Sequence, residues 1–173
     1  LATHDLTALV REAVLLQQEA HGRIEYALSL PGRAVEADID RGLLGQVLTN
    51  LLQNAADSLE TRAERDGDAA PSGRIAVTLE EGARSIRLTV EDNGIGLPRE
   101  GRERLTDPYV TMRARGTGLG LAIVKKIVEQ HGGKLLLGDA GGADGLDGAR
   151  ISVRLPRQSG RNRAAEGRAG EAA

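Results

Sequence analysis

Three short stretches of this sequence hold the polar and glycine residues that could do chemistry. Residues 50–57 contain two asparagines and an aspartate, residues 92–96 place an aspartate beside two glycines, and residues 116–120 form a glycine loop before an apolar run. Amide and carboxylate oxygens suit magnesium and amine donors, while the N–H groups of a glycine loop suit phosphate. Together the stretches indicate a site for a phosphate-bearing ligand.

The first stretch lies on a helix that we predict from Asp40, as its N-cap, to about residue 64. At about 100° per residue, its polar side chains form one narrow stripe beside a leucine-rich face. Such a stripe alone is typical of a solvated surface. Asparagine is unfavourable inside a helix because it competes for backbone hydrogen bonds, so two of them four residues apart favour a site. The stripe consists of Gln46, Asn50, Asn54, Asp57 and Thr61.

Asp92 ends a predicted strand, and Gly94 and Gly96 allow the backbone to turn tightly beside it. An aspartate-asparagine-glycine turn closes strands in many proteins without any further role. A partly buried carboxylate, however, accepts a hydrogen bond from the exocyclic amine of adenine. Guanine places a carbonyl there, and two facing acceptors are costly when buried. The turn therefore predicts ATP over GTP.

The third stretch opens onto an apolar helix, which we predict from Leu119 to His131 and to end at Gly132. Alternate glycines expose successive N–H groups, and the helix N-terminus adds partial positive charge, so the loop suits phosphate. A glycine-rich linker is the simplest alternative. The spacing is not that of a dinucleotide fold, and no Gly-Lys-Ser/Thr of a P-loop occurs. The loop residues are Gly116, Thr117, Gly118, Leu119 and Gly120.

Apolar periodicity predicts the elements that position these stretches. A helix over residues 5–20 buries one face, and a hairpin turns near Glu81. That face consists of Leu6, Leu9, Val10, Ala13, Val14 and Leu16. We predict strands over residues 24–30, near Val35, and over 75–79, 86–90, 135–137 and 151–155.

The pattern fails over residues 97–115, which we interpret as a mobile loop with at most a short helix. Residues 139–148 are rich in aspartate and glycine but lack the alternating ligands of a calcium loop, so a hairpin turn is favoured. Residues 157–173 have almost no apolar bulk and are predicted to be a disordered tail after a domain over 1–156.

Composition limits the function classes. The chain has 173 residues, which suffice for one domain with a real core, and that core must be aliphatic because there is no Phe or Trp and only 2 Tyr. A formal charge of -2 gives no general attraction to nucleic acid or anionic membranes. The absence of cysteine excludes disulfides and, with no signal peptide or membrane span at the sequence level, favours a cytoplasmic setting.

In this order the stretches resemble the motifs of the GHKL (Bergerat) ATP-binding fold, in the version found in sensor histidine kinases. Residues 46–59 are similar to the N box, residues 90–98 to the G1 box, and residues 107–133 to the F-box region and G2 box. The amino-acid sequence of the last segment is most similar to that of nitrogen-regulation kinases of the NtrY/NtrB type. The resemblance implies an α/β sandwich, with a mixed sheet covered by helices on one face.

The resemblance also implies ATP and Mg2+ as cofactors. Asn54 would be the magnesium ligand, Asp92 the adenine reader, and residues 116–120 the phosphate loop. Residues 97–115 would form the ATP lid, from which Arg113 or Arg115 would reach the terminal phosphate.

Asn50 separates two branches of the family. Members that hydrolyse ATP or phosphorylate a hydroxyl usually carry a glutamate four residues before the magnesium-binding asparagine. Water and serine need such a general base, whereas neutral imidazole already offers a lone pair. An amide at Asn50 therefore indicates phosphotransfer to histidine.

The phospho-accepting histidine of such a kinase lies in a dimerisation helix with acidic and basic neighbours. His4, His21 and His131 lack that context and are interpreted as structural. We therefore expect the catalytic half of a kinase, unable to autophosphorylate alone, with the dimerisation domain and a response regulator as partners and a membrane-attached parent. A hydrolytic ATPase and a non-catalytic nucleotide-binding module remain alternatives.

Overall fold

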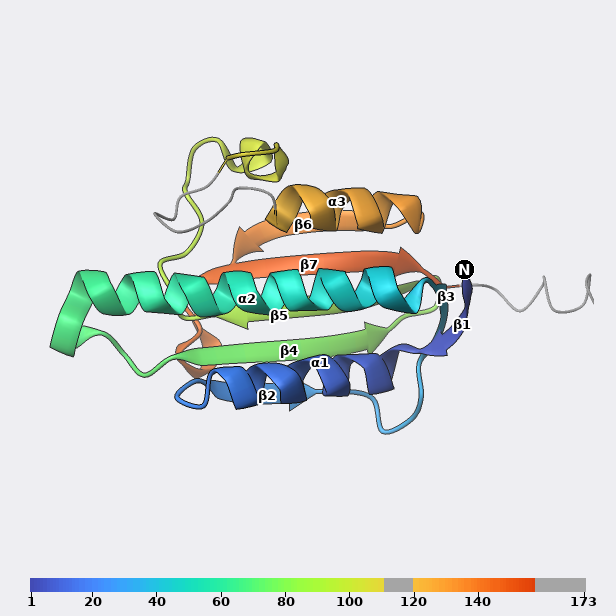
Figure 1. The fold of residues 1–173 in the computed structure, drawn as a ribbon, viewed down its shortest axis with the longest axis horizontal. Coiled ribbons are helices and arrows are strands. Elements are labelled where there is room, and N and C mark those ends of the chain that lie inside the picture. Colours follow the sequence, from blue (N-terminus) through green and yellow to red (C-terminus); the bar gives the residue numbers. More distant parts are fainter. Residues whose placement is uncertain (111–119, 158–173) are drawn as a thin grey trace, which may run out of the picture.

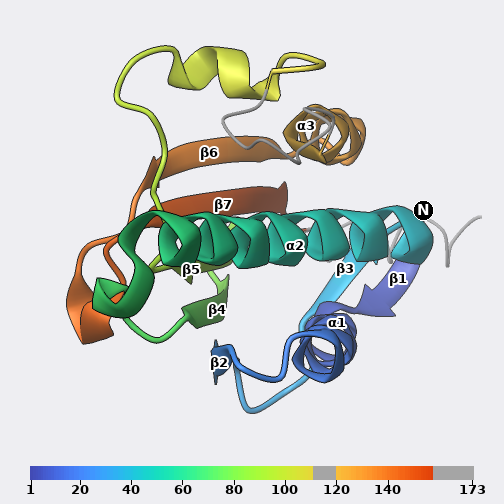
Figure 2. The same ribbon diagram turned by 60° about the vertical axis from the view of Figure 1, so that its left-hand side comes forward.

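The computed structural model describes residues 1–110 and 120–157. A five-stranded mixed sheet has the order β2-β4-β5-β7-β6, and β1 pairs with β3 in a separate two-stranded sheet. The helices α1, α2 and α3 all lie on one face of the large sheet (Figures 1 and 2). The predicted α/β architecture is thus confirmed. The strands are β1 (Ala2–Asp5), β2 (Glu25–Ser29), β3 (Glu36–Ile39), β4 (Arg74–Glu81), β5 (Ser85–Asp92), β6 (Lys134–Asp139) and β7 (Ala149–Pro156), and the helices are α1 (Leu6–Ala20), α2 (Arg41–Asp66) and α3 (Gly120–Gln130).

The sheet is mixed because β2 runs parallel to β4, whereas β4, β5, β7 and β6 pair in antiparallel fashion. The hairpin between β4 and β5 turns after Glu81, as predicted. Its register places Asp92, the last residue of β5, opposite Ile75 at the start of β4. Asp92 therefore ends the central strand β5, which points toward the end of the sheet where α2 also ends (Figure 1).

Side-chain caps set where the helices begin. Asp40 Oδ1 accepts from the N–H of Leu43 at 2.9 Å and starts α2, which confirms the predicted cap. Asp5 caps α1 by accepting from the N–H of Thr7 at 2.9 Å. After α3 the chain turns at Gly132, whose φ of +70° lies in the left-handed region that glycine adopts without strain.

The core between the helices and the sheet is entirely aliphatic. Leu44, Leu48, Leu52 and Val10 are fully buried there, and α2 packs against both α1 and α3. Each such side chain contributes roughly 1.5–3 kcal/mol by leaving water. The core therefore fixes α2 as the central helix of the layer.

Two local expectations need correction. Leu16 was predicted to be on the buried face of α1, but it is 60% exposed, and Gln17 is buried in its place. At about 100° per residue, Gln17 lies roughly 20° from Leu6 around the helix, whereas Leu16 lies roughly 80° away. The strand β1 was not predicted, because its pairing with β3 fixes it and its sequence of four residues has no apolar alternation.

Three short 3₁₀ helices complete the described residues, at Gly67–Ala69, Arg102–Thr106 and Ala143–Gly145. No helix within residues 1–110 and 120–157 is both long enough and apolar enough to cross a membrane. The predicted tail beyond Arg157 lies outside the described residues.

Candidate functional site

The middle of α2 meets the first residue of α3. A β-carbon placed on Gly120 would lie 3.3 Å from Oδ1 and 3.5 Å from Nδ2 of Asn54, so the amide lies beside the side-chain-free face of this glycine. One turn earlier on α2, the Nδ2 of Asn50 is buried and has no acceptor within the described residues. A buried amide donor without an acceptor suits a phosphate oxygen, and the adjacent amide oxygen suits a hard cation.

Asp92 is buried at 4% exposure and is held by backbone groups from two directions. Its Oδ1 accepts from the N–H of Gly94 at 2.8 Å and from the N–H of Ala149 at 3.2 Å. Its own carbonyl accepts from the N–H of Gly148 at 2.9 Å. The orientation of the carboxylate is therefore set before any ligand arrives.

Glycine is required where the Asp92 loop touches its neighbours. A β-carbon on Gly94 would lie 2.1 Å from Ser58 Oγ on α2, and one on Gly148 would lie 2.3 Å from Asp92 Oδ1. The close approach at Gly94 lets Ser58 Oγ accept from the N–H of Ile95 at 3.0 Å. The loop is thus fixed to α2 on one side and to the start of β7 on the other.

Asn93 belongs to the same turn and points away from Asp92. Its Oδ1 accepts from the N–H of Arg74 at 2.8 Å, and its Nδ2 donates to the carbonyl of Ser72 at 2.8 Å. Arg74 is the first residue of β4, and Ser72 lies two residues before it. Asn93 therefore anchors the turn, a role that the sequence reading did not assign.

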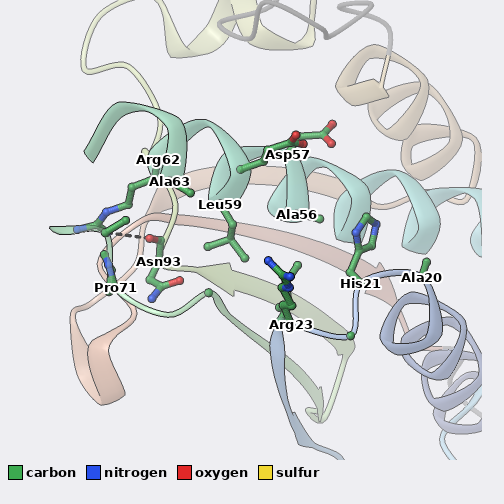
Figure 3. A pocket seen from close by; sticks show the side chains of 15 residues that line it. Ala20, His21, Arg23, Ala56, Asp57, Leu59, Arg62, Ala63, Pro71 and Asn93 are labelled. Atoms are coloured by element: carbon green, nitrogen blue, oxygen red, sulfur yellow. Dashed lines mark hydrogen bonds between the residues drawn. The ribbon is translucent and has the colours of Figure 1, made fainter. Parts of the chain in front are cut away.

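Asp57 accepts at Oδ1 from Nε2 of Gln53 at 2.9 Å. It also borders a pocket of about 630 Å³ between α2, the turn after α1 and the chain before β4 (Figure 3). His21 lies across this pocket and makes a 3.4 Å contact from Nε2 to Oε1 of Gln53. The predicted contact of Asp57 with nucleotide stays a prediction.

The described part of the predicted lid is an irregular segment with one short 3₁₀ helix. Leu105 buries its side chain, and the helix that carries it contacts α3. Arg102 donates from Nε to the carbonyl of Pro98 at 2.7 Å and pairs with Asp139. Gly96 has a φ of +76°, as expected for a turn that glycine permits.

Several predicted site residues lie outside the described residues. They are Arg113, Arg115, Gly116, Thr117, Gly118 and Leu119. Gly120, the last glycine of the loop, is described and lies against Asn54. The described residues contain no group of three or more His, Cys, Asp and Glu side chains that would hold a metal ion by themselves.

His131 is buried and joins the beginning of α2 to the end of α3. Its Nε2 accepts from the N–H of Asp40 at 3.0 Å, so its Nδ1 carries the proton and donates to the carbonyl of Ile127 at 2.7 Å. Both ring nitrogens are therefore engaged, which supports the structural interpretation of this histidine.

Sequence reasoning missed Ser58, Gly148 and Ala149. Ser58 carries no local signal, because a serine on a helix is usually solvent-exposed. Gly148 and Ala149 follow a loop that reads as an ordinary hairpin turn, and they lie 56 and 57 residues from Asp92 along the chain. Contacts of that range appear once β5 pairs with β7.

Comparison with known proteins agrees with this geometry. Residues 39–159 match the sequence family described as histidine kinase-, DNA gyrase B-, and HSP90-like ATPase. The nitrogen regulation protein NtrY of Azorhizobium caulinodans is 42% identical over 138 residues, which are 80% of this chain and 17% of that protein. This chain thus spans about a fifth of the length of that relative.

Solved structures show the same fold. The catalytic domain of the histidine kinase ThkA, in a nucleotide-free form, superposes with a TM-score of 0.75 at 28% identity, covering 90% of this chain and 94% of that domain. A structure of ThkA with its response regulator protein TrrA gives a TM-score of 0.69 at 27% identity, covering 91% of this chain and 42% of the kinase chain.

Proposed function

This chain belongs to the family of histidine kinase-, DNA gyrase B- and HSP90-like ATPases and is an ATP-binding catalytic domain of the histidine-kinase type. From that premise we propose that it binds ATP with magnesium. We propose further that it presents the γ-phosphoryl group to a histidine on a separate dimerisation domain. One observation carries the proposal, namely that the amide of Asn54 lies against Gly120, the last residue of the predicted phosphate loop. The nucleotide phosphates would lie where these two elements meet.

We assign the adenine to Asp92. Its carboxylate is buried and oriented by the N–H groups of Gly94 and Ala149, so it accepts from the 6-amine of adenine without reorganising. The carbonyl of guanine would face the same carboxylate as a second acceptor. Preference for ATP over GTP follows from this arrangement.

The donor set on α2 fits magnesium bound together with phosphate. The Oδ1 of Asn54 would supply one neutral oxygen ligand to the ion, and the buried Nδ2 of Asn50 would donate to a phosphate oxygen. Magnesium, when bound, neutralises charge on the phosphoryl group that is transferred. The protein side chains contribute position and hydrogen bonds, and no carboxylate replaces Asn50 as a general base for water.

The remaining parts of the reaction belong to other segments. ThkA has been solved with a response regulator, and this chain spans a minor part of NtrY. We propose that the acceptor histidine lies in a dimerisation domain of the parent kinase and that a response regulator takes the phosphoryl group next. By resemblance to such kinases, the parent is attached to the inner membrane, with this domain in the cytoplasm.

The direct test is calorimetric titration of this chain with a non-hydrolysable ATP analogue, with and without Mg2+, and in parallel with Asp92→Asn. Saturable, magnesium-dependent binding that is lost in the variant is expected. The γ-phosphoryl of radiolabelled ATP should then move to a histidine of an added dimerisation domain, with little release of free phosphate. Steady phosphate release by the chain alone would instead identify a hydrolytic ATPase, and binding without any transfer would identify a non-catalytic module.

A further inference from the structure

We infer that Arg62 is a positioning residue for adenine recognition, because its guanidinium joins the two backbone segments that orient Asp92. The inference rests on the proposed function, since it assumes that Asp92 reads the adenine. Arg62 lies near the end of α2 and extends from the helix toward the turn after β5 (Figure 3).

The first segment is the turn itself. The Nη1 of Arg62 donates to the carbonyl of Asn93 at 2.7 Å, drawn as a dashed line in Figure 3, and approaches the carbonyl of Gly94 at 3.5 Å. Gly94 is also the residue whose N–H donates to Asp92 Oδ1. The carbonyl of Asn93 and the N–H of Gly94 belong to one planar peptide group, so Arg62 holds the group whose N–H orients the carboxylate.

The second segment leads into β7. The same Nη1 donates to Oδ1 of Asp147 at 2.8 Å, and Nη2 approaches Oδ2 at 3.5 Å. Asp147 directly precedes Gly148 and Ala149, whose N–H groups donate to the carbonyl and the carboxylate of Asp92. One side chain thus contacts both segments that orient Asp92, residues 93–94 and residues 147–149; we call these two segments the Asp92 cradle.

The electrostatics keep this arrangement in place. The hydrogen bond to Asp147 raises the pKa of the Arg62 guanidinium, and Asp66 lies 3.5 Å from Nε on the same helix. The Arg62 side chain is 19% exposed and that of Asp147 is 55% exposed, so water weakens the ion pair, whereas the bond to the Asn93 carbonyl is partly buried. A planar guanidinium reaches several acceptors at once, which the single ammonium of lysine does not reproduce.

Removing Arg62 leaves the leucine core untouched, because its contacts are with loop carbonyls and acidic side chains. The two segments would then lose their common partner, and the Asp92 carboxylate its fixed orientation. Adenine affinity should fall while affinity for the phosphates stays. This distinction separates a positioning role from a merely structural one.

The experiment compares two nucleotides on the Arg62→Met variant. ADP carries the 6-amine, whereas purine riboside diphosphate lacks it and is otherwise the same. In the unaltered chain, ADP should bind about tenfold or more tightly than the analogue, the range of a hydrogen bond to a charged group. In Arg62→Met, ADP should bind about tenfold more weakly and the analogue within about twofold of its original affinity.

Three further single variants test the role of Arg62. Arg65→Met removes an exposed cation from the same helix, one that pairs with Asp66, and should leave both affinities unchanged. Asp147→Asn should shift the ratio in the same direction by less, and combining it with Arg62→Met should add little, because both changes remove one contact. Arg62→Lys should restore the ratio in part.

The outcomes are distinct. Equal losses for ADP and the analogue, or no loss for either, would overturn the positioning role of Arg62 and leave the role of Asp92 standing. An unaltered chain that binds both nucleotides equally would refute the adenine role of Asp92, and the inference with it. Circular dichroism of each variant confirms that the comparison is made on folded protein.

Discussion

The amide of Asn54 faces the position where Gly120 would carry a side chain, although 66 positions separate the two residues in the chain. A β-carbon on Gly120 would stand 3.3 Å from the amide oxygen of Asn54. The contact joins the polar stripe of α2 to the N-terminus of α3, whose N–H groups attract anions. The proposed magnesium and phosphate positions would therefore be adjacent.

Replacing Asn54 with alanine should remove the magnesium dependence of nucleotide binding. Affinity for ADP in the presence of Mg2+ should fall about tenfold or more, because one oxygen ligand is lost, and affinity in EDTA should change little. Titration of ADP with and without Mg2+ measures both. Gln46→Ala, an exposed position on the same stripe, serves as the control. Retained magnesium-dependent affinity would remove Asn54 from the metal site.

Replacing Gly148 with alanine should abolish adenine recognition. The new methyl group would stand 2.3 Å from Asp92 Oδ1 and 2.7 Å from the Asp92 carbonyl, so the carboxylate must move. Such overpacking costs about 1–3 kcal/mol of stability, and ADP affinity should drop at least tenfold, a difference of about 1.4 kcal/mol. Gly138→Ala on β6 is matched, because its nearest neighbour there is 3.9 Å away. Normal ADP binding by Gly148→Ala would contradict the cradle.

Replacing Tyr26 with phenylalanine should stabilise the domain. The Tyr26 hydroxyl is buried and has no hydrogen-bond partner within the described residues, so its removal should raise the free energy of unfolding by about 1 kcal/mol. Urea denaturation at neutral pH measures this gain. Tyr109→Phe is the control, because that side chain is 79% exposed and should give no change.

The same substitution should alter how the free energy of unfolding depends on pH in the alkaline range. Burial raises the pKa of Tyr26 from its ordinary value of 10.0. The unfolded chain therefore loses this proton first, and the stability of the unaltered protein falls as the pH rises through about 10. The difference between Tyr26→Phe and the unaltered chain should grow above that pH. A constant difference from pH 8 to pH 11 would argue that the hydroxyl ionises equally in both states.

Replacing His131 with leucine should weaken the junction of α2 and α3. The N–H of Asp40 would lose its acceptor while the volume is roughly kept, which costs about 1–3 kcal/mol. His131→Gln should recover part of the loss, since an amide oxygen can accept. Thermal unfolding measures both, with His4→Leu on β1 as the comparison. Phosphoryl transfer from ATP to an added dimerisation domain should persist in the folded His131 and His4 variants, and radiolabel retained on this chain itself would point to an acceptor within it.

Periodicity and capping were sufficient to predict the three helices and the strands of the large sheet, because those signals are local. Asp40 at the start of α2 and Gly132 after α3 are of this kind. Leu16 shows where residue type misleads. Its side chain is apolar but exposed, because the angular position around α1 places Gln17, and not Leu16, against the core. The short strand β1 depends on its partner β3, which no local pattern reveals.

The candidate site divides in the same way. The turn at Asp92 and the asparagines of α2 were readable as motifs, and the family resemblance put them in one site. Ala149 and Arg62 were not readable, because their importance comes from contacts 57 and 31 residues apart. Local sequence thus suggested Asp92 as the group that would read the ligand, whereas the tertiary fold determines which residues orient its carboxylate.

The two-sided support of Asp92 has a consequence for protein engineering. Copying residues 92–96 into another scaffold would transfer the carboxylate without the N–H of Ala149 and without the arginine that spans both supports. A transplant that preserved base selectivity would have to carry residues 147–149 and the second half of α2 as well. If Asp92 reads the base as proposed, base selectivity would depend on three chain segments, and recombination would have to transfer all three together.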